Sequence, residues 1–205
     1  MKSLVKYLAE SQNFLVNKHS SKIVYNYHPK TRDELKKLVN KLIKERGLEA
    51  DLNDIDTSAI TDMSNMFQNS KFNGDISNWD VSNVTDMSFM FANSKFTSKN
   101  GDIFSWDVSN VTDMAYIFAN SEFVGDISGW DVSNVTDMSF MFAGSKFIGD
   151  ISNWNVSNVK DMSDMFICSK FTGDISNWNV SNVKDMSYMF ADSPLTNNSP
   201  AWYVF

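Results

Sequence analysis

A 24-residue repeat constrains this chain more than any other feature of its sequence. The stretch GDISNWDVSNVTDMSFMFANSKF at residues 74–96 recurs, whole or nearly so, over three quarters of the protein. One methionine marks each unit, at intervals of 24, 27, 24, 24 and 24 residues: Met63, Met87, Met114, Met138, Met162 and Met186. The six tryptophans keep the same intervals, and the long step reflects three extra residues within 97–100. A fixed period in the twenties predicts a solenoid in which each unit is one coil.

Each unit carries one apolar set that a lone coil cannot bury. In the unit read above, this set is Ile76, Trp79, Val81, Val84, Met87, Met90, Phe91 and Phe96. Because ordering the backbone costs more free energy than one such set returns, neighbouring coils must share the buried surface. Ile76–Trp79 and Val84–Met87 are predicted to be short extended segments, and Ser88–Asn93 one helical or 3₁₀ turn. Gly and Asn suit the turns between them, and a side-chain ladder that includes Asn83 is expected to satisfy turn amides along the stack.

Residues 1–50 are predicted to form an α/β cap on the first coil. Residues 1–18 have helical spacing, and residues 23–28 alternate like a strand that Pro29 ends. The clearest helix starts at a capping box of Thr31 and Glu34 and stops at Gly47. Its one-sided apolar stripe is suited to cover the exposed end of a solenoid.

The repeats are predicted to occupy residues 51–197 as about six units, and residues 198–205 to form a C-terminal half-coil. Trp202 and Val204 fall one period after Trp178 and Val180. They are therefore expected to join the buried set. The predicted fold class is an α+β repeat solenoid with a helical N-terminal cap.

Charge and composition exclude several classes of function. Residues 1–50 hold 11 Lys and Arg against 5 Asp and Glu, and residues 51–205 hold 7 against 20, which leaves the repeats at −13. An acidic body argues against a nucleic-acid partner, because phosphate binding needs a cationic surface. We find no stretch long enough for membrane insertion and no export signal or lipid anchor, so the chain as it stands is predicted to be cytoplasmic. The single cysteine, Cys168, permits no intrachain disulfide and no cysteine zinc site.

The recurring methionines and aspartates raise the question of a metal. Thioethers favour copper(I), but these methionines recur at core spacing beside Phe, where Met is a flexible filler. Two rows of aspartates, which include Asp75 and Asp86, supply one carboxylate per coil, and bonds to turn amides account for each. Calcium binding by these rows stays open. We predict no cofactor, no metal site and no catalytic residue, because no nucleophile motif appears and no polar residue breaks the repeat as a catalytic site would.

The most informative position is the one where the repeat varies. Between the serine and the second methionine of each motif stand Asn65, Phe89, Tyr116, Phe140, Asp164 and Tyr188. If Met87, Met90 and Phe91 point inward, this position points outward. Exposed aromatic residues in a row mark interaction surfaces, so the predicted binding residues are Phe89, Tyr116, Phe140 and Tyr188. The alternative is that these rings pack under a neighbouring loop.

The stretch SNVTDMSFMF, followed by SKF.GDIS.W, resembles a bacterial surface-protein repeat of mycoplasma lipoproteins and of BspA-like leucine-rich-repeat proteins. The resemblance covers residues 51–197. It implies a leucine-rich-repeat-like, right-handed coil and a non-enzymatic role in adhesion or in binding a protein or glycan, at the cell surface if a leader is missing. The alternative is an intracellular acidic inhibitor or immunity-type protein that binds a basic protein. A monomer is expected in either case.

Overall fold

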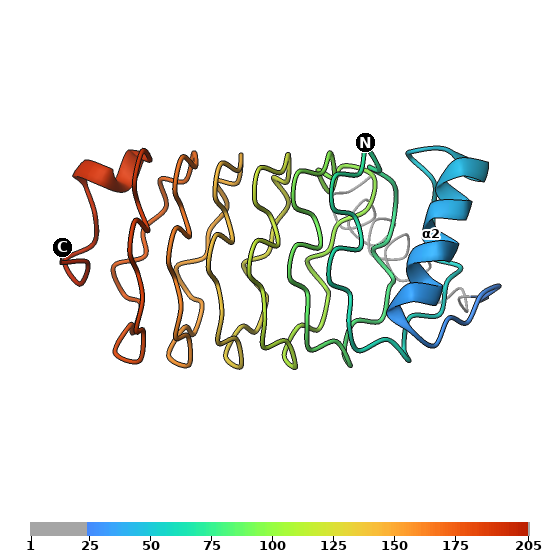
Figure 1. Cartoon of the computed structure of the whole chain (residues 1–205), viewed down its shortest axis with the longest axis horizontal. Coiled ribbons are helices and arrows are strands. Elements are labelled where there is room, and N and C mark those ends of the chain that lie inside the picture. Colours follow the sequence, from blue (N-terminus) through green and yellow to red (C-terminus); the bar gives the residue numbers. More distant parts are fainter. Residues whose placement is uncertain (1–23, 205) are drawn as a thin grey trace, which may run out of the picture.

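The computed structural model describes residues 24–204 and arranges most of them as short coils stacked along one axis (Figure 1). Regular secondary structure is sparse in this part of the chain. It consists of one α-helix, α2 (Arg32–Arg46), and one 3₁₀ helix, η1 (Pro194–Asn197). The helix α2 lies at one end of the stack and η1 near the other. The helix predicted over residues 1–18 lies outside the described residues.

Each coil turns through consecutive β-turns. In the unit around Phe89, three overlapping turns are each closed by an N–H that donates to the carbonyl three residues earlier. These bonds are Met90 N to Met87 O, Ala92 N to Phe89 O and Ser94 N to Phe91 O, each 3.1 Å. The predicted helical or 3₁₀ turn over Ser88–Asn93 is therefore wrong. Phe89 and Asn93 have φ of 56° and 54°, which a right-handed helix does not allow.

The two segments predicted to be extended also differ from expectation. Ile76–Trp79 is a turn, because Trp79 N donates to Ile76 O at 3.1 Å. Val84–Met87 pairs with its neighbours in a parallel bridge at one residue only, Asp86. One such bridge recurs between each pair of neighbouring coils, in a column through Asp62, Asp86, Asp113, Asp137, Asp161 and Asp185. Short turns thus replace the predicted strands.

Main-chain hydrogen bonds between coils run in one direction on the face formed by residues 87–93 and their equivalents. Each donor lies in one coil and its acceptor in the next, at 2.8–3.0 Å: Met87 to Asp113, Phe89 to Ala115, Phe91 to Ile117 and Asn93 to Ala119. Aligned peptide dipoles add, as they do in a helix. This face therefore presents carbonyl oxygens at the α2 end of the stack and N–H groups at the far end.

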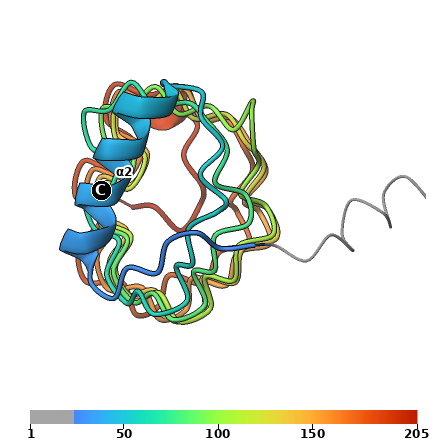
Figure 2. The ribbon, with the colours of Figure 1, turned by 90° about the vertical axis from the view of Figure 1, so that its right-hand side faces the viewer.

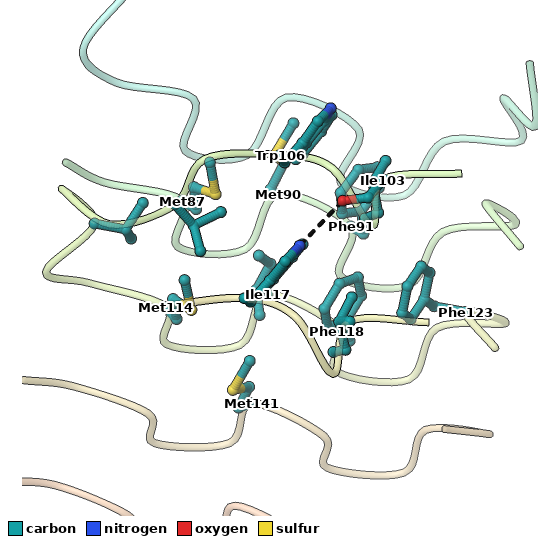
Figure 3. Close-up of a cluster of buried hydrophobic side chains, with 14 of the residues drawn as sticks. Met87, Met90, Phe91, Ile103, Trp106, Met114, Ile117, Phe118, Phe123 and Met141 are labelled. Carbon is teal, nitrogen blue, oxygen red and sulfur yellow. Dashed lines mark hydrogen bonds between the residues drawn. The ribbon is translucent and has the colours of Figure 1, made fainter. Parts of the chain in front are cut away.

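Aromatic ladders fill the core. Six buried rings stack from coil to coil with centroids 5.5–5.9 Å apart: Phe67, Phe91, Phe118, Phe142, Phe166 and Phe190. Figure 3 shows Phe91 and Phe118 in this ladder beside Met87, Met90 and Met114, which are also fully buried. The methionines therefore pack as core fillers between rings.

The tryptophans bind each coil to the one before it. The indole N–H donates to a main-chain carbonyl at 3.0–3.2 Å in five pairs: Trp79 to Leu52, Trp130 to Ile103 (the dashed bond in Figure 3), Trp154 to Ile127, Trp178 to Ile151 and Trp202 to Ile175. Trp106 is the exception, because its buried Nε1 has no partner in residues 24–204. It follows the three-residue insertion within 97–100, which changes the spacing to the coil before it.

The helix α2 lies across the end of the stack (Figure 2) and buries Leu35, Val39 and Leu42. Thr31 Oγ1 accepts from Glu34 N at 3.3 Å, as predicted, but the Glu34 carboxylate accepts from Lys30 N at 2.7 Å. The capping box is therefore half formed. Gly47 ends the helix with φ of 95°, a value that glycine adopts easily. In the described part of the predicted strand at 23–28, one residue pairs: Tyr27, with Ile55.

Two cations of α2 cover the carbonyl oxygens at this end of the stack. Arg32 Nε donates to Ser64 O at 2.8 Å, and Lys36 Nζ donates to Asn65 O at 2.7 Å and to Met66 O. In the next coil, the oxygen equivalent to Ser64 O accepts from the N–H of Asn65 at 2.9 Å. The α2 cations thus replace the donors that a preceding coil would supply. Burial, with a smaller effect of Arg32, lowers the pKa of Lys36.

The last described residues close part of the far end. Trp202 and Tyr203 pack on the ring of Phe190, with centroids 6.1 and 4.8 Å away. Val204 is 81% exposed, so the expectation that it joins the buried set is wrong. Two aromatic rings therefore cover the core at this end.

Candidate functional site

Six residues, one per coil, share a left-handed backbone on the face made by the consecutive turns. Their φ values lie between 53° and 58°: Asn65, Phe89, Tyr116, Phe140, Asp164 and Tyr188. We call these six residues the left-handed row. Each occupies the third position of a turn such as Met87–Met90, where a positive φ normally selects Gly or Asn. A bulky ring costs about 1–2 kcal/mol in that conformation, so the four aromatic residues are held there against a local preference.

Three of these residues form a stacked ladder. The rings of Phe89 and Tyr116 lie 4.4 Å apart at 8°, and those of Tyr116 and Phe140 have the same spacing and angle. All three rings are half-buried. Together with Ile167, they pack against a second, small apolar cluster that is separate from the main core: Ala92, Ala119 and Ala143. The aromatic ladder therefore lies outside the core and keeps its outer edges accessible.

Tyr188, the fourth predicted binding residue, is not part of the ladder. Asp164 lies between Phe140 and Tyr188 in the row, and the Tyr188 side chain is 70% exposed. Tyr188 also lines a pocket of about 440 Å³ at the far end of the stack, together with Phe190 and Tyr203. The structure thus brings three of the four predicted residues together and separates the last by one acidic residue.

Carboxylates surround this row. Burial raises the pKa of Tyr116, and Asp164, Asp137 and Asp161 add to the effect. Burial likewise raises the pKa of Asp164, with further contributions from Asp185 and Asp161. Among residues 24–204, none of these four acids forms an ion pair. The surface around the ladder is therefore apolar at its centre and negative at its border.

The aspartate rows carry out the structural role predicted for them. Asp86 Oδ1 accepts from Ser88 N at 2.8 Å, and Asp75 Oδ1 from Ser77 N at 2.9 Å. Sequence reasoning missed a third row with the same turn: Asp80, Asp107, Asp131, Asn155 and Asn179. The signal was available, because these residues also stand two positions before a serine. Within the described chain, no three His, Cys, Asp or Glu side chains converge to hold a metal ion.

The predicted asparagine ladder exists with the opposite polarity. Each side-chain amide donates to the carbonyl of a serine in the preceding coil, at 2.7–2.9 Å: Asn83 to Ser58, Asn110 to Ser82, Asn134 to Ser109, Asn158 to Ser133 and Asn182 to Ser157. The prediction that these residues satisfy turn amides is therefore wrong, since they satisfy turn carbonyls. Their hydrogen bonds hold neighbouring coils together.

The fold and the row define a repeat protein of short stacked coils with an aromatic ladder outside its core. The chain matches the family described as "Mycoplasma protein of unknown function, DUF285" over residues 34–124 and again over 94–203. It belongs to this family, which confirms the mycoplasma part of the resemblance noted above. Searches among curated proteins and among solved structures found no match. Within residues 24–204, no helix has the length and apolarity to cross a membrane.

Proposed function

We propose that this protein is a non-enzymatic binding module whose left-handed row contacts a protein or glycan. The observation that carries the proposal is the aromatic ladder of Phe89, Tyr116 and Phe140, stacked outside the core on a strained backbone. A core does not need these rings, and strained positions cluster at functional sites. Aromatic residues also carry a large share of binding energy at interfaces.

The proposal includes the architecture behind this surface. We infer an α+β solenoid of the BspA-like, leucine-rich-repeat type, with right-handed coils and α2 as part of its cap. The column of parallel bridges and the two matches to one repeat family support it. We further propose that it acts as a monomer, takes no cofactor, binds no nucleic acid and inserts into no membrane. A cell-surface location is the proposal that the family supports, and a cytoplasmic one follows if no leader precedes the chain.

A second candidate function is an acidic inhibitor or immunity-type protein that binds a basic protein partner. The carboxylates along the row, which form no ion pair within residues 24–204, favour it. Electrostatic steering would then dominate association, and binding would weaken strongly with added salt. Binding through the ladder depends on apolar contact instead, and is expected to change less with salt.

The test is a triple variant, Phe89→Ser with Tyr116→Ser and Phe140→Ser. We expect it to fold, because none of the three rings belongs to the main core, and to lose binding to a partner isolated by pull-down at low and high salt. The matched control is Val124→Ser with Ile148→Ser, which removes exposed apolar side chains elsewhere. Normal partner binding by the folded triple variant would contradict the proposal, and salt-sensitive binding would then favour the acidic inhibitor.

A further inference from the structure

Asp164 interrupts the aromatic residues of the left-handed row. Phe140 precedes it by one coil and Tyr188 follows it by one coil, on the same backbone conformation. Within the ladder, neighbouring rings cover each other's faces at 4.4 Å. Among residues 24–204, the ring of Phe140 stacks only with Tyr116, so its face toward Asp164 has no ring against it. In the described chain, this face of Phe140 is therefore covered by no ring, whereas inside the ladder each ring has another ring against its face.

The distance between Phe140 and Tyr188, on either side of Asp164, follows from the spacing of the coils. Neighbouring hydrogen-bonded strands lie about 4.7–4.9 Å apart, so two coil intervals separate the backbones at Phe140 and Tyr188 by roughly 9–10 Å. Carbon atoms in contact lie roughly 3.5–4.0 Å apart. One planar group therefore fits between two side chains at this separation.

The charge in the gap selects the kind of ligand. The Asp164 carboxylate is half-buried, and no hydrogen bond or cation among the described residues stabilises its charged form. Asp161 and Asp185 lie near enough to oppose that charge further. An incoming cation relieves this repulsion, whereas a carboxylate or phosphate ligand would increase it.

We propose that Phe140, Asp164 and Tyr188 form a slot for one arginine side chain of a protein partner. The slot rests on the binding function proposed above for the left-handed row, and it names the chemistry of that partner. A guanidinium group is planar, stacks on aromatic faces and pairs with a carboxylate through two N–H groups. A lysine ammonium matches the charge but not the planar shape, so it binds less well.

The test uses hexa-arginine, hexa-lysine and hexa-glutamate peptides with the whole protein, by titration calorimetry at 0.15 M salt. We expect hexa-arginine to bind more tightly than hexa-lysine, and hexa-glutamate not to bind. Asp164→Asn removes the charge and is expected to weaken hexa-arginine binding roughly tenfold. Asp164→Phe fills the slot with a ring and is also expected to weaken hexa-arginine binding roughly tenfold. The matched control, Asp150→Asn, removes an exposed carboxylate of another row and is expected to change affinity less than about twofold.

Several outcomes would overturn the slot: no binding of hexa-arginine, equal binding of hexa-lysine, or equal losses in Asp164→Asn and Asp150→Asn. Ring resonances of Phe140 and Tyr188 in the unsubstituted protein provide a measurement that needs no variant, and unchanged shifts at saturation contradict the proposal. A double variant, Phe89→Ser with Tyr116→Ser, leaves the slot in place. If it retains hexa-arginine binding and also keeps its natural partner, the ladder proposal fails while the slot stands.

Discussion

At many positions of this protein, the sign of the backbone angle φ limits the residue type as much as burial does. A second left-handed row uses residue types that tolerate this conformation, with Cys168 as the exception: Asn69, Asn93, Asn120, Gly144, Cys168 and Asp192. The left-handed row of the site holds Phe and Tyr at four of its six positions, although rings are disfavoured there. Contact between neighbouring rings offsets that cost, so aromatic residues are expected to stabilise one another only where they are adjacent in the row.

The indole ladder gives a residue-scale prediction with an internal control. Trp130→Phe removes one of the two donors to the buried Ile103 carbonyl and leaves Trp106 N at 3.2 Å, whereas Trp106→Phe removes a side-chain N–H that has no partner in the described chain. Both changes remove similar volume. We expect Trp130→Phe to lower the free energy of unfolding by about 0.5–1.5 kcal/mol more than Trp106→Phe, measured by urea denaturation. Equal losses would show that the indole hydrogen bonds contribute little to stability.

At the scale of elements, α2 matters for its charge as well as for its apolar face. The stack presents carbonyl oxygens at this end, and Arg32 and Lys36 supply the donors that another coil would provide. A helix with the same apolar stripe and no cation at these two positions would bury the core and leave the carbonyl oxygens of Ser64 and Met66 without these donors. The basic character of residues 1–50 is thus partly explained by the polarity of the coils that they cover.

The prediction at this scale is Lys36→Met, which retains most of the side-chain stem and removes the ammonium group. Met66 O then loses its donor, and we expect a loss of about 1–3 kcal/mol in the free energy of unfolding. For a chain of this size, each 1 kcal/mol lowers Tm by roughly 2–4 °C. Lys37→Met is the control, since that side chain is exposed on the same helix. A Tm for Lys36→Met that matches the control would contradict the capping role.

At the scale of the whole molecule, stability is shared between neighbouring coils. Rings, indoles and main-chain N–H groups all make their contacts one coil away. Such a stack is approximately a sum of unit and interface terms. Removing one unit should therefore eliminate two interfaces between coils and create one new interface, provided that the 24-residue period is kept.

Deletion of residues 126–149 removes one period and keeps every ladder in phase. We expect this variant to fold and to melt in a single transition, at a lower temperature than the intact protein. Deletion of twelve residues, 126–137, places apolar side chains against turn positions and should abolish cooperative melting. Circular dichroism during heating distinguishes the two, and similar melting curves would contradict a stack built on a 24-residue period.

The sequence by itself determined the period, the buried set, the α2 helix and the turns that the aspartates close. These features depend on contacts within one unit or on repetition itself, and both can be read along the chain. The sequence also identified the positions of the left-handed row, because the residue type there varies from unit to unit.

The tertiary structure alone decided the backbone of that row, the stacking of Phe89, Tyr116 and Phe140, and the separation of Tyr188 from them. It also decided that Trp106 has no partner in residues 24–204 and that Val204 is exposed. The physical reason is that each of these depends on the neighbouring coil. A short segment with helical spacing satisfies its apolar pattern equally well as a helix or as a series of turns. The hydrogen bonds of the adjacent coil select the turns.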